Sequence, residues 1–255
     1  MKLLTLNTWG GQVHAPLMKF IERMAPEVDI FCFQEVYSTL TDLEFSHGAK
    51  MNLHQDISKV LKSHREYHSP KSKGYDFSGY IGKDISFGNA IFIRKEIPVS
   101  HYEEAFDVIN DEGHDWRKNA VAKAQIMTVE VSAKSLVLSN FHGVWIQGTH
   151  KKDTPERIEQ SDHLKEILDS FSGEKIICGD FNLLPDGESI KILEQGMRNL
   201  IKDFNITSTR SSLYGTSPIK FADYALVTPG IKVNKFEVLP DEVSDHLALM
   251  LDFNI

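Results

Sequence analysis

Short apolar runs alternate with polar stretches along the 255-residue chain, and the period of each run predicts a strand or a helix. In the first run, Leu4 and Leu6 share one face and Leu3 and Thr5 the other, which predicts a strand. The pattern predicts strands at residues 2–8, 28–33, 89–94, 120–131, 135–142, 176–178, 223–228 and 248–253, and helices at residues 16–24, 53–61, 158–171 and 188–197.

Three polar segments separate these elements. Residues 68–87 are rich in Gly, Ser, Lys and Tyr and predict a long loop, and residues 206–221 predict another. Residues 101–119 are acidic and predict a solvated excursion. The chain has no repeat, low-complexity tract or linker-like break, so we expect one domain over residues 1–255. Strands first alternate with helices and then run in pairs, which predicts a mixed α/β sandwich.

The stretch I-I-C-G-D-F-N-L-L-P-D, residues 176–186, carries the clearest chemistry. Its apolar start predicts the end of a buried strand, and Gly179 allows the backbone to turn. In an extended chain Asp180 and Asn182 project to the same side, whereas Phe181 points into a core. Strand ends are where α/β folds place ligands. A polar turn that caps the next helix is the ordinary alternative.

Other predicted strands also begin or end at polar groups. These groups are Asn7, Glu35, His142, Asp223 and the pair Asp245-His246. Charged and His side chains beside apolar runs are costly unless they are paired or bound to a metal. Each position alone is ordinary: a helix-starting carboxylate, a core histidine or a cap. Their recurrence at the same kind of position favours one shared site.

Composition limits the classes of partner. The formal net charge is −8, which does not favour nucleic acid as a partner, although a local basic groove could bind it. Cys32 and Cys178 lie in apolar runs and are expected to be reduced core thiols. The first apolar run is too short for a signal peptide, and no stretch is long enough to span a membrane. A cytoplasmic location is the expectation.

In order along the chain, the motifs L-N-T-W, F-Q-E-V, N-F-H-G, G-D-F-N-L-L-P-D, A-D-Y-A-L-V and S-D-H-L-A-L resemble the endonuclease/exonuclease/phosphatase superfamily. The resemblance covers residues 3–253. It implies a deoxyribonuclease-I-like fold, in which two packed mixed β-sheets flanked by helices form a four-layer sandwich. It also implies a hydrolase of phosphate esters, with the site at the top of the sheets. The motifs do not separate nucleases from phosphatases or lipid phosphodiesterases.

The resemblance implies a role for each motif residue. Glu35 matches the direct Mg²⁺ ligand, and Asn7 and Asp245 match groups near the metal. Mg²⁺ is the expected cofactor, with Mn²⁺ as a substitute, because a hard octahedral ion keeps several waters and needs few protein oxygens. Asp180 matches the residue that aligns or deprotonates the attacking water, and Asn182 matches one that holds the phosphate.

Two histidines and a carboxylate complete the catalytic set implied by the resemblance. His246 matches a histidine that contacts a phosphate oxygen, Asp223 matches the carboxylate that orients it, and His142 matches a second phosphate-contacting histidine. Asn89 and Arg117 are weaker candidates for contacts to the substrate phosphate. The group that protonates the leaving oxygen is left open.

We expect phosphodiesters to be the substrates, and several alternatives stay open. A nuclease needs a basic groove, for which the candidates are Lys71, Lys73, Lys83, Lys151, Lys152 and Arg157. Trp9, Trp116 and Trp145 could stack on a base or a headgroup, or could simply pack in the core or rim. A phosphatase of a small molecule, nucleotide or lipid headgroup needs only a pocket. A non-catalytic binding module is the third alternative.

Overall fold

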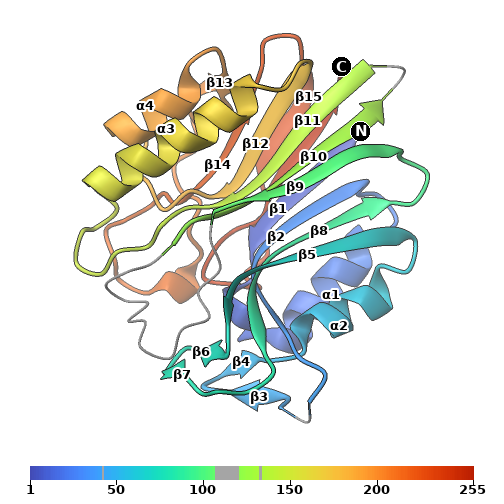
Figure 1. Ribbon diagram of the computed structural model, residues 1–255, viewed down its shortest axis with the longest axis vertical. Coiled ribbons are helices and arrows are strands. Elements are labelled where there is room, and N and C mark those ends of the chain that lie inside the picture. Colours follow the sequence, from blue (N-terminus) through green and yellow to red (C-terminus); the bar gives the residue numbers. More distant parts are fainter. Residues whose placement is uncertain (42, 107–120, 132–133) are drawn as a thin grey trace.

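The computed structural model describes residues 1–41, 43–106, 121–131 and 134–255. Within these residues two six-stranded mixed sheets pack face to face, and helices cover the outer face of each sheet (Figure 1). The predicted mixed α/β sandwich is therefore confirmed.

The first sheet has the strand order β15-β16-β1-β2-β8-β5. Its strands are β1 (Lys2–Asn7), β2 (Ile30–Ser38), β5 (His64–Lys73), β8 (Ser86–Arg94), β15 (Lys232–Val238) and β16 (Leu249–Asn254). β1 and β2 run parallel, so both carboxyl ends reach the same edge of the sheet.

The second sheet has the order β13-β14-β12-β11-β10-β9. Its strands are β9 (Val99–Ala105), β10 (Lys123–Val131), β11 (Lys134–His142), β12 (Glu174–Asp180), β13 (Arg198–Asn199) and β14 (Asp223–Val227). Here β11 and β12 run parallel. Each sheet thus contributes one parallel pair whose carboxyl ends carry polar residues.

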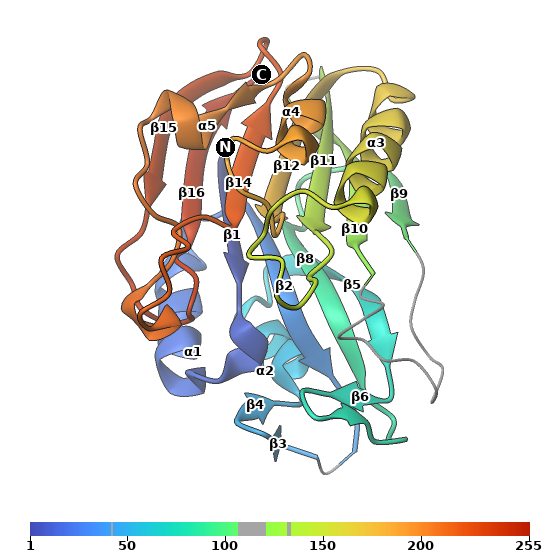
Figure 2. The same ribbon diagram turned by 90° about the vertical axis from the view of Figure 1, so that its left-hand side faces the viewer.

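The remaining elements are helices and two small hairpins. The helices are α1 (His14–Met24), α2 (Leu53–Val60), α3 (Pro155–Asp169), α4 (Glu188–Glu194) and α5 (Leu200–Asp203), with 3₁₀ turns η1 (Trp9–Gly11) and η2 (Ser212–Tyr214). The hairpins pair β3 (Phe45–Ser46) with β4 (Ala49–Lys50), and β6 (Tyr75–Asp76) with β7 (Gly79–Tyr80). Both hairpins lie at the same end of the sandwich (Figures 1 and 2).

Alternating side chains on each strand fill two apolar layers. In β1, Leu3 packs in the core between the sheets, whereas Leu4 and Leu6 pack with α1 and α2. The period-two prediction for this strand is confirmed. The helices contribute apolar stripes such as Leu17 and Ile21 of α1, which are fully buried.

A network of buried amides joins the two sheets. Asn140 of β11 donates from Nδ2 to the backbone oxygen of Phe33 in the other sheet (3.1 Å) and accepts from Gln34 Nε2 (2.7 Å). In the opposite direction, Asn89 of β8 donates to the backbone oxygens of Lys123 (3.2 Å) and Asn140 (3.0 Å). A buried amide N–H group without an acceptor is costly, so the bonds that these N–H groups donate favour one relative position of the sheets.

Several element predictions are wrong in part. The predicted loop at 68–87 contains the end of β5, both strands of the β6–β7 hairpin and the start of β8, because an edge strand such as β5 tolerates polar residues. The acidic segment begins with most of β9, and its residues 107–119 lie outside the described residues. β2 continues through Glu35 to Ser38, and β15 was missed because its alternating polar residues carry a weak signal.

Two predictions from composition can be compared with the structure. Cys32 and Cys178 are buried free thiols, as expected. Among the described residues no helix has both the length and the apolar character needed to span a membrane.

Gly179 is the position at which the structure requires a glycine most clearly. Its φ is +133°, and a Cβ placed there would lie 2.1 Å from the backbone oxygen of Phe141. We expect Gly179→Ala to lower the free energy of unfolding by at least about 3 kcal/mol, measured by urea denaturation. Gly148→Ala is the control: its φ is also positive, at +78°, but a Cβ there meets nothing within 4 Å. That variant should lose only about 1–2 kcal/mol. Equal losses would contradict the steric explanation.

Candidate active site

The polar residues at the strand ends surround one cavity of about 310 Å³. The cavity is lined by Glu35, His142, Asp180, Asn182, Asp245 and His246, together with Lys71, Arg210 and several aromatic side chains. These residues come from both sheets, because the carboxyl ends of β1 and β2 lie opposite those of β11 and β12. Asn7 joins the two sets: its Nδ2 donates to Glu35 Oε1 and to Asp180 Oδ2, both at 2.9 Å.

Asp180 is held from several sides. The backbone N–H of Asn182 donates to Asp180 Oδ1 (2.9 Å), and Lys151 Nζ lies 4.0 Å from the same oxygen. Burial raises the pKa of Asp180, but Lys151, His246, His142 and Arg210 together lower it well below its usual range. The carboxylate is therefore ionised at neutral pH.

Asn182 lies beside Asp180, but its backbone does not have the extended conformation that was predicted. Its φ is +55°, so the chain leaves the extended conformation after β12. The side chain donates to the backbone oxygen of Gly143 (3.2 Å) and accepts from Lys151 Nζ. Phe181 points away and is fully buried against Phe141 and Tyr224, as predicted. Glu35 also has a positive φ, +58°, and such strained residues cluster at functional sites.

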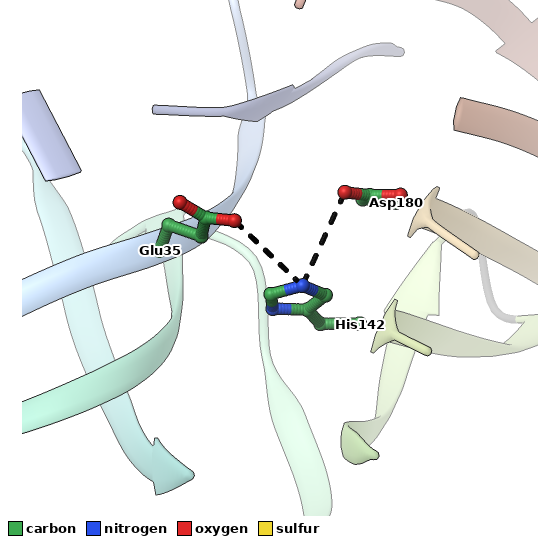
Figure 3. A group of neighbouring side chains, drawn as sticks. All are labelled: Glu35, His142 and Asp180. Carbon is green, nitrogen blue, oxygen red and sulfur yellow. Dashed lines mark ion pairs between the residues drawn. The ribbon is translucent and has the colours of Figure 1, made fainter. Parts of the chain in front are cut away.

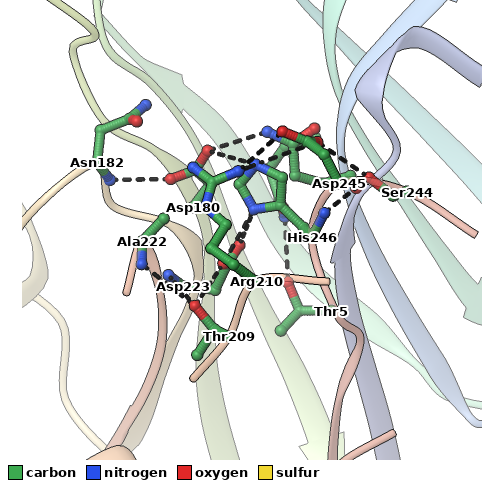
Figure 4. A network of polar contacts seen from close by, with 12 residues as sticks. Thr5, Asp180, Asn182, Thr209, Arg210, Ala222, Asp223, Ser244, Asp245 and His246 are labelled. Atoms are coloured by element: carbon green, nitrogen blue, oxygen red, sulfur yellow. Dashed lines mark hydrogen bonds and ion pairs between the residues drawn. The ribbon is translucent and has the colours of Figure 1, made fainter. Parts of the chain in front are cut away.

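His246 is oriented by Asp223 (Figure 4). Its Nδ1 lies 2.8 Å from Asp223 Oδ1, and its Nε2 lies 3.6 Å from Asp180 Oδ2. Because Arg210 Nη1 can only donate, its 2.5 Å contact with Nε2 places the ring proton on Nδ1, facing Asp223. Burial and Arg210 lower the pKa of His246, but the carboxylates of Asp223, Asp245 and Asp180 raise it above its usual value.

His142 lies between the two carboxylates that come from opposite sheets (Figure 3). Its Nε2 is 3.9 Å from Glu35 Oε1 and 4.0 Å from Asp180 Oδ2. Burial, and then the nearby Lys71, lower the pKa of His142 well below its usual value. The ring is therefore neutral in this arrangement, and its Nδ1 has no hydrogen-bond partner among the described residues.

Arg210 is a residue that the sequence analysis did not single out. It lies in the predicted loop at 206–221, where its side chain is only 6% exposed. Nη1 donates to Asp245 Oδ2 (3.0 Å), and the guanidinium lies 3.9 Å from the centroid of Tyr214. An arginine among T-S-T-R-S-S carries no periodic signal, so only its position near Asp223 in the chain could have suggested it.

The candidates for a basic groove separate into two groups. Lys71 is buried at the cavity and Lys151 is buried against Asn182 and Asp180, and burial lowers the pKa of each to about 8. Lys73, Lys83 and Lys152 are exposed. Arg157 does not fit a groove: it is fully buried and donates to Thr149 Oγ1 (2.8 Å).

The weaker candidates also differ in outcome. Asn89 is fully buried in the amide network between the sheets and does not line the cavity, so its bonds give it a structural role. Trp9 and Trp145 line the cavity. Arg117 and Trp116 lie outside the described residues.

The donor set around Glu35 fits a divalent cation. Ligand atoms of Glu35, His142 and Asp180 lie within 4.8 Å of one another. Burial raises the pKa of Glu35, and no Lys or Arg of the described residues lies within 4.0 Å of its carboxylate. A partly buried carboxylate without a Lys or Arg partner is costly, and carboxylate oxygens are the ligands that Mg²⁺ prefers. Asn7 turns its NH₂ group toward Glu35, so in this arrangement it positions the carboxylate.

Solved structures with little sequence in common share this fold. An endonuclease/exonuclease/phosphatase family protein from Leptotrichia buccalis has a TM-score of 0.71 at 18% identity, with 100% of each chain covered. The mannosyl-6-phosphatase Bt3783 of Bacteroides thetaiotaomicron has a TM-score of 0.71 at 15% identity, again with 100% of each chain covered. The human Nocturnin catalytic domain with bound sulfate has a TM-score of 0.69 at 16% identity, with 100% of this chain and 93% of the Nocturnin chain covered.

At these identities the structural likeness shows the fold alone. No curated protein sequence matches the chain closely enough to count as a relative. The profile described as "Endonuclease/Exonuclease/phosphatase family" matches residues 4–246, and the chain therefore belongs to this family.

Proposed function

We propose that the protein is a divalent-metal-dependent hydrolase of phosphate esters that acts on phosphodiesters. The observation that carries the proposal is the convergence of Asp180, the His246–Asp223 pair and Glu35 on one cavity. Members of this family are hydrolytic phosphoesterases, which agrees with that geometry. A binding module would not need an oriented histidine beside an ionised carboxylate, so the arrangement favours an enzyme.

Each group has a role in an in-line attack of water on phosphorus. Asp180 is ionised and aligns the water, and hydrogen bonds from Asn7 and from the backbone of Asn182 fix its position. His246 Nε2 and Arg210 Nη1 meet at the cavity. When His246 is protonated, a non-bridging phosphate oxygen can replace the contact between them and accept from both. Asp223 holds the imidazole, and Asn182 lines the cavity beside Asp180.

The cation would be held by Glu35, with Asp245 nearby, and His142 and Asp180 complete the donor set. A bound divalent cation neutralises charge that develops on the phosphoryl oxygens. We propose Mg²⁺, because the groups around Glu35 are mostly oxygen donors.

The test of the proposed function is hydrolysis of bis-p-nitrophenyl phosphate and p-nitrophenyl phosphate by the whole chain, with and without Mg²⁺. We expect turnover of the diester that EDTA abolishes and Mg²⁺ or Mn²⁺ restores. Turnover of the monoester alone would overturn the preference for diesters. No turnover of either ester at any metal concentration would count against the enzyme and favour a binding module.

Glu35→Gln should specifically weaken the dependence on metal. We expect the Mg²⁺ concentration for half-maximal rate to rise at least about tenfold, because even partners of metal ligands change metal affinity by that much. Glu44→Gln is the control, since that carboxylate lies on the surface at 70% exposure. An unchanged Mg²⁺ requirement in Glu35→Gln would show that Glu35 is not a metal ligand.

A further inference from the structure

Beyond the catalytic groups, the cavity has an aromatic wall made of Tyr37, Phe77 and Phe87. The rings of Tyr37 and Phe87 lie 4.6 Å apart, and those of Tyr37 and Phe77 lie 5.5 Å apart at 86°. Tyr37 is buried, whereas Phe77 and Phe87 are partly exposed and line the cavity. The proposed chemistry at phosphorus makes no use of this wall.

A β-bulge places a lysine at the same cavity as the wall. In the β5–β8 ladder Pro70 pairs with Gly88 and Ser72 with Phe87, so Lys71 is the extra residue. Bulges change the direction of a side chain and recur beside active sites. Gly88 permits this one, because a Cβ there would lie 2.0 Å from the backbone oxygen of Ser69.

Lys71 itself is buried at the cavity, at 7% exposure. No carboxylate of the described residues lies within ion-pair distance of its Nζ, although the charges of Glu35 and Asp180 act on it and raise its pKa against the effect of burial. An ammonium group buried without a carboxylate in contact is available for an anionic ligand. The same bulge therefore places Lys71 and the ring of Phe87 at one cavity.

The size of the cavity limits the ligand. Its volume of about 310 Å³ lies at the small end of the range for ligand pockets, roughly 300–1,000 Å³. An aromatic wall suits a planar ring, since stacking on aromatic side chains is favourable for any ring with a π-face. Long duplex nucleic acid would instead need an extended basic surface, and the net charge of −8 does not favour one.

We propose that Lys71 and the aromatic wall of Tyr37, Phe77 and Phe87 form a substrate subsite. The substrate class is a compact phosphate ester, of nucleotide size, that carries a planar ring. Lys71 binds a phosphate oxygen, and the ring of the substrate packs on Phe87 and Phe77. This inference rests on the proposed function, because it assumes that phosphate occupies the catalytic end of the cavity.

Binding of two inert phosphonates tests the subsite without requiring turnover. Phenylphosphonate and methylphosphonate differ in the ring, and neither contains a hydrolysable ester. By calorimetry with Mg²⁺ present, we expect phenylphosphonate to bind the wild-type chain at least about tenfold more tightly than methylphosphonate. Phe87→Ala should reduce that ratio to near one. Phe87→Leu, which keeps more of the packing against Tyr37, should reduce it as well, and thermal melting shows whether either variant is folded.

The lysine is tested by its effect on both ligands. Lys71→Gln should weaken the binding of both phosphonates by a similar factor of about ten and leave the ratio of their affinities unchanged. Lys73 is an exposed lysine on the same strand, and Lys73→Gln should change the affinity for neither phosphonate. A wild-type ratio near one, or a ratio that persists in folded Phe87 variants, would overturn the subsite.

Two outcomes distinguish this inference from the proposed function. If bis-p-nitrophenyl phosphate is hydrolysed but the phosphonate ratio is near one, the subsite fails and the phosphoesterase stands. If the ratio holds but no ester is hydrolysed, the subsite stands and the enzyme fails. A duplex oligonucleotide that displaces phenylphosphonate would overturn the compact substrate and favour nucleic acid.

Discussion

Asp180→Asn should reduce the rate of Mg²⁺-stimulated diester hydrolysis by at least about a hundredfold. The carboxylate accepts hydrogen bonds from Asn7 and from the backbone of Asn182, and it is the ionised group placed to align water. Asparagine has nearly the same shape but neither the charge nor the second acceptor. The measurement is kcat for bis-p-nitrophenyl phosphate at saturating Mg²⁺.

The control for this variant is Asp162→Asn, which removes an exposed carboxylate from α3. It should keep the wild-type rate. Circular dichroism and the melting temperature show whether Asp180→Asn is folded, because loss of the charge also removes the electrostatic partner of Lys151. A folded Asp180→Asn chain with a rate within a few-fold of wild type would refute the assigned role.

His246→Gln should have an effect of similar size, at least about a hundredfold on kcat. The imidazole contacts both Arg210 and Asp223, and unlike glutamine it can be protonated at Nε2 when a phosphate oxygen is bound. Asp223→Asn should reduce the rate at least about tenfold, because Asp223 acts through the histidine by fixing its tautomer.

A double-variant cycle separates this positioning role from a merely structural one. If Asp223 acts through His246, the double variant should be about as slow as His246→Gln alone, since residues that act as one unit are not additive. His101→Gln, an exposed histidine on β9, is the control and should keep the wild-type rate. Fully additive losses in the double variant would show that Asp223 contributes independently of the histidine.

The sequence predicted the core of the fold because its apolar runs are long and regular. The strand at the N-terminus and the helices at 16–24 and 53–61 carry clear periods, and all three elements are present. β15 and the end of β5 were missed because they are edge strands, in which polar residues weaken the alternation. The hairpins at 45–50 and 75–80 are too short to produce a period.

The convergence of residues on one cavity was predictable where a residue belongs to a motif at a strand end. Glu35, His142 and Asp180 meet at one cavity because the fold brings parallel strand pairs of two sheets together, and His246 joins them from the segment before β16. Arg210 and the role of Lys71 could not be predicted, since one lies in an aperiodic loop and the other depends on a bulge that one extra residue creates. Asn89 shows the opposite error: a polar residue in a strand can serve the contact between sheets rather than the substrate.

The buried amides of Asn140, Asn89 and Gln34 have a consequence for how this chain can change. Their N–H groups donate across the sheets only at one alignment, and that alignment also sets the separation of Glu35 from Asp180. The segments at 71–87 and 206–221, which form walls of the cavity, take no part in these hydrogen bonds. New specificities are therefore reached most readily by substitutions in those two segments, while the floor of the pocket stays constant.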